Sequence, residues 1–414
     1  MDPPRLCEAA RPHKHNPLVL QRNPGKESTQ KKTCHELDEK SLGPALNGSH
    51  APLLCRDRLL SCLVKFVARL GCPFTFMKKF LVTGATGFLG THLVDALLRR
   101  FADCSDLTSI RILSRGGNPW NENPRIEVFH GDILNAGAVD RAVESVSGIL
   151  HLAGFVTRDP ANGADLYQTH VQGTRNICES ALAHGGPRVV VVSSSGTIAV
   201  SRQPKIHNED SLYSNDVVAF WPYYLSKIYQ EKLALSYHAL KELPVVIVNP
   251  SLLLGPRDER FSSTGDVRLF LAGKVTNIPF GGLNFVDVRD AAEALIQAML
   301  AGLPGRRYLV GGYNMTLAEF FSMIQRVSGV RAPRFSIPER WSRRGARALR
   351  ALYSWFGGHF PLDDTTVEMA YRFWYLDNSR AKAELGLTTR PPEVTLRDTV
   401  EYLRRMNETT DEHR

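Results

Sequence analysis

Residues 77–98 read MKKFLVTGATGFLGTHLVDALL, and this stretch decides the fold. It begins with a short apolar run typical of a buried strand and ends with apolar residues at helical spacing. The glycines between the two parts are Gly84, Gly87 and Gly90. Glycines at this point allow a tight turn and let backbone N–H groups approach a pyrophosphate, which the positive end of the following helix stabilises. The stretch therefore predicts the first strand, turn and helix of a dinucleotide-binding fold.

Apolar runs of strand length recur along the chain, and helical stretches separate most of them. They cover residues 109–114, 125–132, 148–154, 188–195 and 244–250. Strands that alternate with helices form a parallel sheet covered on both faces. The sequence therefore predicts an α/β fold with a Rossmann-type doubly wound parallel sheet.

The first 76 residues have a different composition. Residues 1–50 are rich in Pro, Lys, Asn, Ser and Gly without a sustained period, which is typical of a disordered segment. Residues 51–71 place apolar residues at helical spacing among Arg and Lys, as in a basic amphipathic helix that contacts a membrane or a partner. The interpretation that we favour is an extension upstream of a true start at Met77, which contributes nothing to the fold.

The composition excludes several classes of protein. With 414 residues, 43% of them hydrophobic and 22% charged, the chain is expected to form a globular protein with a sizeable core. It has no long apolar run and no secretory signal, so we expect a cytoplasmic protein. Five of the seven cysteines precede Met77, and no spacing matches a paired-cysteine zinc site, so no metal is expected. Residues 1–76 carry five of the nine net positive charges, and no nucleic-acid motif occurs, so nucleic acid is not an expected partner.

The end of the second predicted strand bears on the choice of cofactor. An acidic residue at this position would bind the 2′-hydroxyl of NAD, but the chain has Ser114 and Arg115. A hydroxyl and a guanidinium suit a phosphate, which favours NADP(H) over NAD(H); the alternative is that Arg115 only solvates a loop. After the third strand, Asp132 is placed either to accept a hydrogen bond from the adenine amine or to cap a helix, and Ile133 follows it.

The sequence WPYYLSKIYQEKLA, at residues 221–234, carries the predicted chemistry. Tyr223 and Lys227 are four residues apart and so share one face of a helix. A nearby ammonium lowers the pKa of a phenol, which lets the tyrosine exchange a proton with a substrate oxygen while hydride moves to or from a nicotinamide. Ser195 ends a predicted strand and supplies a hydroxyl for that oxygen, with Ser193 and Ser194 as competing candidates.

The chain from Met77 to about Met406 resembles the extended short-chain dehydrogenase/reductases, also called the NAD-dependent epimerase/dehydratase family. The resemblance rests on TGATGFLG, HGDI, HLAG, VQGTRN, SSS, YYLSK and VNPSLLLGP. The segments VVIVNPSLLLGPRD, NFVDVRDAAEA and DNSRAKAELGL look most like the dihydroflavonol-reductase-like branch, which includes hopanoid-associated sugar epimerases. The resemblance implies an NAD(P)-binding domain at 77–250, continued by 283–310. It implies a smaller C-terminal α/β substrate lobe at 251–282 and 311–414.

The family pattern also implies site residues. Ser195, Tyr223 and Lys227 would form the catalytic triad, and Lys227 would also hold the nicotinamide ribose. The cofactor would be lined by Gly84, Thr86, Gly87, Phe88, Leu89, Gly90, Ser114, Arg115, Asp132, Ile133, Ala153, Gly154, Tyr223, Lys227 and Asn249–Ser251, which includes Pro250 and Ser251. The chain departs from the pattern at His170, where the family commonly has Asn; we favour a structural role for this histidine. The family often forms dimers, so a homodimer is a further expectation.

The substrate side is less specific. Phe155, Phe220, Phe261 and Phe280 flank motif positions and favour an apolar or lipid-like substrate. Residues 331–350 contain seven Arg and one Glu, with aromatic and leucine residues nearby. This pattern fits a solvated helix face beside a hydrophobic lid, which we favour, or a helix resting on an anionic membrane surface.

The sequence therefore predicts an NAD(P)-dependent oxidoreductase that interconverts a ketone and a secondary alcohol, with Tyr223 as general acid and base. The first alternative is an NAD-dependent sugar epimerase or dehydratase that uses the same triad. The second alternative is a non-catalytic NADP-binding sensor or scaffold.

Overall fold

The structure is a computed structural model and describes residues 79–102, 109–117, 119–120, 122–355 and 364–411. The predicted extension at 1–76, with its amphipathic stretch at 51–71, lies outside the described residues. The large sheet is formed by β1 (Lys79–Thr83), β2 (Ser109–Ser114), β3 (Ile126–His130), β4 (Gly148–His151), β5 (Arg188–Val192), β6 (Val245–Pro250) and β9 (Arg307–Val310).

The seven strands are all parallel and follow the order β3-β2-β1-β4-β5-β6-β9. This confirms the predicted Rossmann-type sheet. The central strands β5 and β6 are nearly continuous runs of buried Val and Ile, as expected when helices cover both faces. The strand order reverses between β1 and β4, where Val82 pairs with Ile112 on one side and Leu150 on the other. Ligands of such sheets bind beyond the carboxyl ends of the strands at this reversal.

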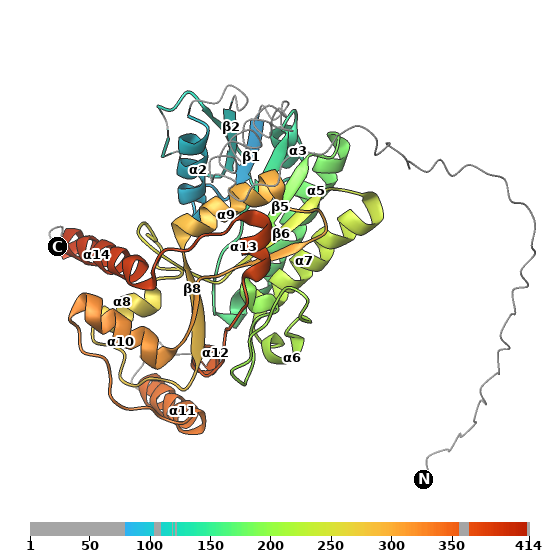
Figure 1. The fold of residues 1–414 in the computed structure, drawn as a ribbon. Helices are drawn as coiled ribbons and strands as arrows, with labels where there is room; N and C mark the ends of the chain where they lie inside the picture. The colour runs from blue at the N-terminus through green and yellow to red at the C-terminus, as the bar shows by residue number, and fades with distance from the viewer. Residues whose placement is uncertain (1–78, 103–108, 118, 121, 356–363, 412–414) are drawn as a thin grey trace, which may run out of the picture. The chain divides into compact units, whose positions relative to one another are not determined.

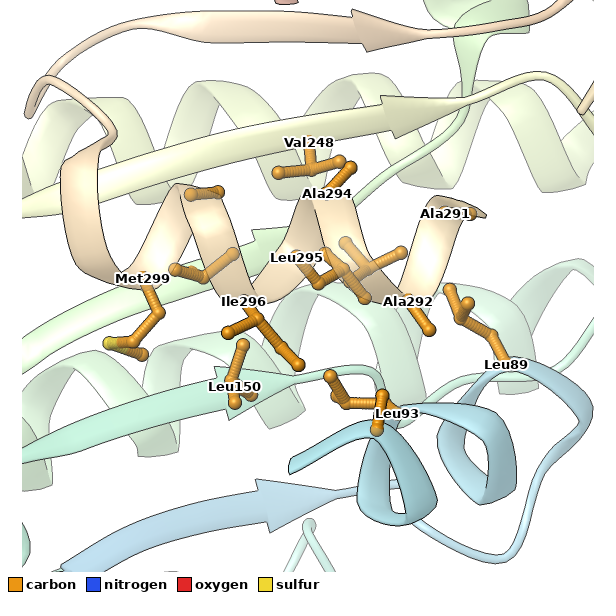
Figure 2. Packing of buried hydrophobic residues seen from close by; sticks show 14 of the residues in the cluster. Leu89, Leu93, Leu150, Val248, Ala291, Ala292, Ala294, Leu295, Ile296 and Met299 are labelled. Carbon is orange, nitrogen blue, oxygen red and sulfur yellow. The ribbon is translucent and has the colours of Figure 1, made fainter. Parts of the chain in front are cut away.

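Helices pack on both faces of the sheet (Figure 1). On one face lie α2 (Phe88–Arg100) and α9 (Val288–Ala301), and on the other lie α3 (Ala136–Val143), α5 (Gly173–Ala183) and α7 (Pro222–Lys241). Figure 2 shows α9 against α2, where Leu89 and Leu93 meet the α9 side chains and Leu150 comes from the sheet below. Alanines on α9 let the two helices approach closely, which fixes the helix that follows the glycine turn.

A second, three-stranded sheet has the order β10-β8-β7, built from β7 (Leu252–Leu254), β8 (Gly282–Asp287) and β10 (Tyr313–Thr316). Its core includes side chains of α8 (Gly265–Leu271), α10 (Leu317–Ser328) and α14 (Pro392–Asp411). Of the predicted continuation at 283–310, α9 and β9 join the large sheet or its face, whereas β8 belongs to the small sheet. The chain therefore leaves the small sheet at Asp287, where α9 begins.

The remaining elements are short or lie outside the two sheets. They are α4 (Gly163–Tyr167), α6 (Asn215–Val218), α11 (Glu339–Trp355), α12 (Asp364–Ala370) and α13 (Ser379–Leu385), with a π-helix at Gln168–Gln172 and 3-10 turns at Pro160–Asn162 and Ser195–Thr197.

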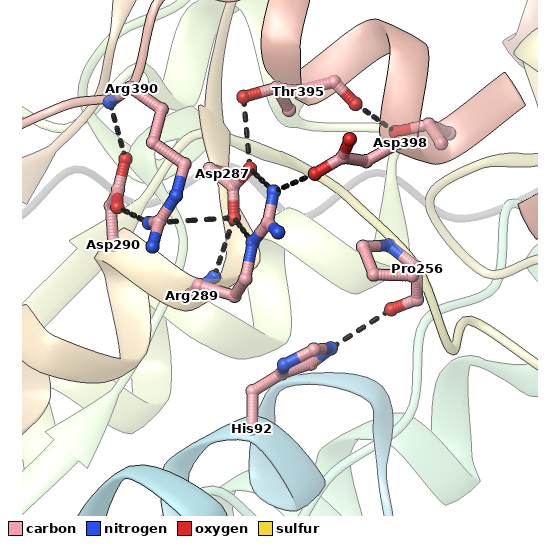
Figure 3. A network of polar contacts seen from close by, with 9 residues as sticks. His92, Pro256, Asp287, Arg289, Asp290, Arg390, Thr395 and Asp398 are labelled. Carbon is pink, nitrogen blue, oxygen red and sulfur yellow. Dashed lines mark hydrogen bonds and ion pairs between the residues drawn. The ribbon is translucent and has the colours of Figure 1, made fainter. Parts of the chain in front are cut away.

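A polar network ties α9 to the C-terminal helix α14 (Figure 3). The buried carboxylate of Asp287 accepts hydrogen bonds from Arg289 and from Thr395 on α14. Arg289 also pairs with Asp398 of α14 at 2.6 Å, and Asp290 pairs with Arg390. The network therefore joins the helix on the large sheet to the helix on the small one.

Candidate active site

The glycine turn has the geometry that an approaching phosphate requires. Gly84 has φ +71°, and a Cβ on it would lie 2.8 Å from the backbone of Leu152 and Ala153. A Cβ on Gly90 would lie 2.1 Å from the carbonyl oxygen of Gly84, so the helix packs directly on the turn. Gly87 is the N-cap of α2 and no side chain caps the helix there. The first N–H groups of α2 are therefore available to an anion.

The predicted phosphate-reading residues lie at the ends of β2 and β3. The side chain of Arg115 is 79% exposed, and its Nη1 lies 3.6 Å from Oδ2 of Asp132. The other oxygen of Asp132 accepts a hydrogen bond from the backbone N–H of Leu134. Ser114 exchanges long hydrogen bonds of 3.3 Å with the backbone of Gly116. The structure thus brings Ser114, Arg115 and Asp132 to one edge, where the largely exposed guanidinium pairs with Asp132.

Lys227 is buried and held by two hydrogen bonds. Its Nζ donates to the carbonyl oxygen of Val192 and to Oε1 of Gln230, each at 2.9 Å. Burial lowers the pKa of Lys227 to about 7, although the charge of Glu231 opposes this. Two of the three N–H donors are used, so one remains for Tyr223 or a bound ligand.

Tyr223 lies in the first turn of α7, after Pro222 at the first helical position. Burial and the neighbouring Tyr224 raise the pKa of Tyr223 above its usual range, and a hydrogen bond with the Ser194 side chain opposes the rise. Ser194 is thus the serine whose hydroxyl acts on the pKa of Tyr223. Ser195 is buried next to it at the start of a 3-10 turn, and Ser193 is turned away to bond with Glu231.

Two buried polar groups beneath these residues were not predicted from the sequence. Glu231 lies four residues after Lys227 and accepts hydrogen bonds through Oε1 from Ser193, Thr197 and Asn249. It therefore joins α7 to the ends of β5 and β6. Burial raises the pKa of Glu231, whereas Ser193 and the guanidinium of Arg307, 3.7 Å away, lower it. The four-residue spacing from Lys227 is the sequence signal that could have placed Glu231 on the same face of α7.

The second group is a chain of hydrogen bonds from Lys227 to β1. Gln230 donates to Oγ1 of Thr174 at 2.8 Å, and Thr174 donates to the carbonyl of His170. His151 lies between Thr174 and Thr83, at 2.9 and 2.8 Å. Because Thr174 has already given its only proton to a carbonyl, His151 donates to it through Nε2 and accepts from Thr83 through Nδ1. Burial, with the Lys227 charge, lowers the pKa of His151 to about 3, which keeps the ring neutral.

His170 lies inside the site. Its ring centroid is 5.7 Å from that of Tyr223, and its Nδ1 is 2.8 Å from Oγ of Ser226. A Cβ on Gly154 would lie 2.6 Å from Nε2 of His170 and 3.7 Å from Nζ of Lys227. His170 also belongs to the π-helix at Gln168–Gln172, a distortion that often occurs at functional sites.

Of the four phenylalanines predicted to line an apolar pocket, Phe155 lies beside the site, with its ring centroid 6.2 Å from that of His170. Phe220 is 85% exposed and Phe280 is 75% exposed, and Phe261 lies under the guanidinium of Arg268. Instead, Tyr224 lies 5.0 Å from Tyr223 and 5.2 Å from Trp374, measured between ring centroids. Trp374 comes from the C-terminal segment, far from the motifs in sequence, so no local pattern identified it.

The residues present fit a dinucleotide. The start of α2 is uncapped, and the buried Oγ of Ser251 has no hydrogen-bond partner in the described part of the chain. Gly154 is exposed, and Ala153 donates its N–H to Thr83. Ile133 is buried and packs against Gly173, so it shapes the adjoining wall. These features lie around the strand reversal, where such a ligand binds.

The chain is similar in sequence to a known enzyme family and to several of its members. The profile described as "NAD dependent epimerase/dehydratase family" matches residues 80–311. The chain is 30% identical over 337 residues to "Sterol demethylase protein B" of Methylococcus capsulatus, which covers 78% of this chain and 98% of that protein. It is 31% identical over 329 residues to a "Putative dihydroflavonol 4-reductase" of Synechocystis, covering 78% and 94%.

Solved structures share the fold. The structure titled "Crystal structure of gox2253" superposes with a TM-score of 0.66 at 28% identity, covering 80% of this chain and 98% of that one. A dTDP-glucose 4,6-dehydratase of Streptomyces venezuelae, solved with NAD bound, gives 0.63 at 23% identity, covering 80% and 98%. The second likeness concerns the fold alone.

Proposed function

The chain belongs to the NAD-dependent epimerase/dehydratase family, an enzyme family of the extended short-chain dehydrogenase/reductase type that uses NAD(P), and on this premise we propose that it reduces a ketone to a secondary alcohol, or the reverse, with NADP(H). One observation carries the proposal: Lys227 is buried, fixed by Val192 and Gln230, and has one N–H left on the helix face that also carries Tyr223.

The chain's own groups suit this reaction. The first N–H groups of α2 would bind the pyrophosphate, Gly154 and Ser251 would line the cofactor, and Lys227 would hold the nicotinamide ribose. A nicotinamide bound there would supply the hydride transfer to or from the substrate carbon. The Ser194 or Ser195 hydroxyl would hold the carbonyl oxygen while Tyr223 donates the proton. The cationic form of Lys227 favours the tyrosinate that remains.

Arg115 favours NADP(H). Its exposed guanidinium at the end of β2, next to Ser114, suits a 2′-phosphate, and no carboxylate occupies the end of that strand. The names of the relatives favour the reductase class, because one is called a dihydroflavonol 4-reductase. The second candidate, an NAD-dependent epimerase or dehydratase, has the fold of the NAD-bound dehydratase in its favour.

The test is made on the full chain. Its extracted cofactor is identified, NADPH and NADH are titrated, and oxidation of NADPH is followed with a panel of ketones, sterols and nucleotide sugars. We expect freely exchanging NADPH, at least about tenfold tighter than NADH, and ketone turnover that Tyr223→Phe abolishes. Tyr229→Phe, on the exposed face of the same helix, is the matched control and should keep its activity. Tightly retained NAD with epimerised or dehydrated sugar would favour the second candidate, and full biological activity of Tyr223→Phe would favour a non-catalytic sensor.

A further inference from the structure

Large apolar side chains gather with arginines at the start of α11, in a surface that we call the aromatic–arginine patch. Phe335 is 76% exposed, Phe280 75%, Trp341 54% and Ile337 40%. The backbone N–H of Ile278 donates to the carbonyl of Phe335 at 2.9 Å, which brings the segments of Phe280 and Phe335 side by side. The exposed basic members of the patch are Arg331, Arg334, Arg340 and Arg344.

The patch is built on a fixed base. The hydroxyl of Tyr371 donates to the carbonyl of Ile337 and contacts the hydroxyl of Ser342 at 2.6 Å. These bonds hold the entry to α11 and its first turn. The rings and arginines on the outer side are thus presented by an anchored segment of the lobe, at its edge in Figure 1.

The acidic groups next to the patch are turned inward. The buried guanidinium of Arg372 binds Glu339 at 3.1 Å and Glu368 at 2.7 Å, and Arg343 also pairs with Glu339. Both carboxylates therefore compensate a buried cation, and the outer arginines add a positive field at the surface. One of them, Arg344, lies over the ring of Trp341 at 5.4 Å. Positive charge and exposed aromatic rings thus occupy the same place.

We propose that the aromatic–arginine patch docks the protein on the surface of an anionic lipid bilayer. Trp and Phe side chains insert at the level of lipid headgroups, and arginines bind headgroup phosphates there. Exposed apolar groups of this size mark an interaction surface, and the charge complements anionic lipid rather than a basic or neutral partner. None of the described helices is long and apolar enough to cross a bilayer. The inference goes beyond the proposed reaction and stands independently of it.

The test is flotation of the full chain with vesicles of phosphatidylcholine alone and of phosphatidylcholine with phosphatidylglycerol. We expect binding to the vesicles with phosphatidylglycerol only, weakened by salt because the Debye length shortens. Two double variants test the patch. One combines Phe335→Ser with Trp341→Ser, the other combines Arg340→Glu with Arg344→Glu, and each should reduce binding about tenfold or more. Leu240→Ser is the matched control, because Leu240 is 82% exposed at the end of α7, outside the patch.

Folding of each variant is checked by thermal unfolding and by circular dichroism. The proposal would be overturned if wild-type protein bound no better to vesicles with phosphatidylglycerol than to vesicles of phosphatidylcholine alone. Undiminished binding by both patch variants would also overturn it, because another part of the chain, such as residues 51–71, would then make the contact. If sedimentation shows that the wild-type protein and the Leu240→Ser control are dimers and that the patch variants are monomers, the surface binds a second copy of the chain. That result would overturn the lipid assignment.

Discussion

Gln230 accepts a hydrogen bond from Lys227, with 2.9 Å between Oε1 and Nζ, inside helix α7. The amide is itself fixed, because its Nε2 donates to Thr174 at 2.8 Å. Lys227 therefore cannot rotate its ammonium freely, although its long stem would otherwise allow it. Because the amide is fixed, the third N–H of the Lys227 ammonium points in one direction. A lysine that acts on a neighbouring tyrosine requires such a fixed orientation.

We expect Gln230→Leu to lower kcat about tenfold or more and the free energy of unfolding by about 1–3 kcal/mol, because it leaves buried donors and acceptors unpaired. Gln230→Glu keeps an acceptor and adds a negative charge, which raises the pKa of Lys227. Since loss of the lysine charge lowers the rate as pH rises through about 7, the activity of Gln230→Glu should extend to higher pH. Profiles of kcat/KM against pH measure this, and identical profiles for all three proteins would refute it.

The three serines after β5 should differ in function. Ser194→Ala should lower kcat by about 100-fold, because Ser194 is the hydroxyl that interacts with Tyr223. Ser193→Ala should mainly reduce stability, since Ser193 donates to the buried Glu231. If Ser195→Ala instead causes the larger loss of kcat, Ser195 holds the substrate oxygen, as the family pattern predicts. Single-turnover kinetics and thermal unfolding of the three variants decide between these assignments.

The parts of the fold that were predictable have local signals. The strand runs and the turn at Gly84 follow from apolar periodicity and glycine spacing, and the sheet order confirms them. Tyr223 and Lys227 share a helix face because of their spacing alone, without any tertiary information.

The remaining groups depend on contacts between distant segments. Trp374 reaches Tyr224 across about 150 residues of sequence, and Arg307 reaches Glu231 only after β9 has joined β6. The choice among three adjacent serines depends on backbone dihedrals at the strand end, where Ser194 is extended and Ser195 begins a 3-10 turn. A sequence pattern does not specify such a rotation.

The ion pair between Arg115 and Asp132 should affect cofactor affinity. Asp132 lies 3.6 Å from the guanidinium and competes with a 2′-phosphate for it. We expect Arg115→Ala to weaken NADPH binding about tenfold and leave NADH unchanged, and Asp132→Asn to tighten NADPH binding by up to a few fold. Fluorescence titrations with both cofactors measure these constants. Equal losses for NADPH and NADH in Arg115→Ala would mean that Arg115 does not read the phosphate.

Asp287 should make stability depend on acidity. Burial alone would raise its pKa, but hydrogen bonds from Arg289 and Thr395 outweigh this, and the pKa of Asp287 is lowered. A lowered pKa contributes stability above the unfolded value of about 4, and this is lost as pH falls through the folded value. Asp287→Asn should therefore cost about 1–3 kcal/mol at neutral pH and less at low pH. Urea unfolding from neutral to acid pH measures both curves, and a constant difference between them would contradict the assignment.

His170 should position Tyr223 through Ser226. Ser226 donates its only proton to the carbonyl of Tyr223 at 2.7 Å, so His170 donates to Ser226 through Nδ1. Burial and the charges of Lys227 and His151 hold the pKa of His170 well below its usual range, so the ring is neutral. We expect His170→Phe, which keeps a ring but loses the donor, to lower kcat about tenfold with a smaller change in the dissociation constant of NADPH.

A double-mutant cycle tests whether the histidine acts through this hydrogen bond. If it does, Ser226→Ala should cause a similar loss of kcat, and the double variant should be no worse than the stronger single one. His170→Asn should recover part of the activity, since its amide is also a neutral donor. His207→Phe is the control, because His207 is also buried but has no ring contact or hydrogen bond with Tyr223 in the described residues. Additive losses in the cycle would show that His170 and Ser226 act separately. If Tyr223→Phe loses activity but the His170 and Ser226 variants do not, the role of His170 is limited to its packing against Gly154.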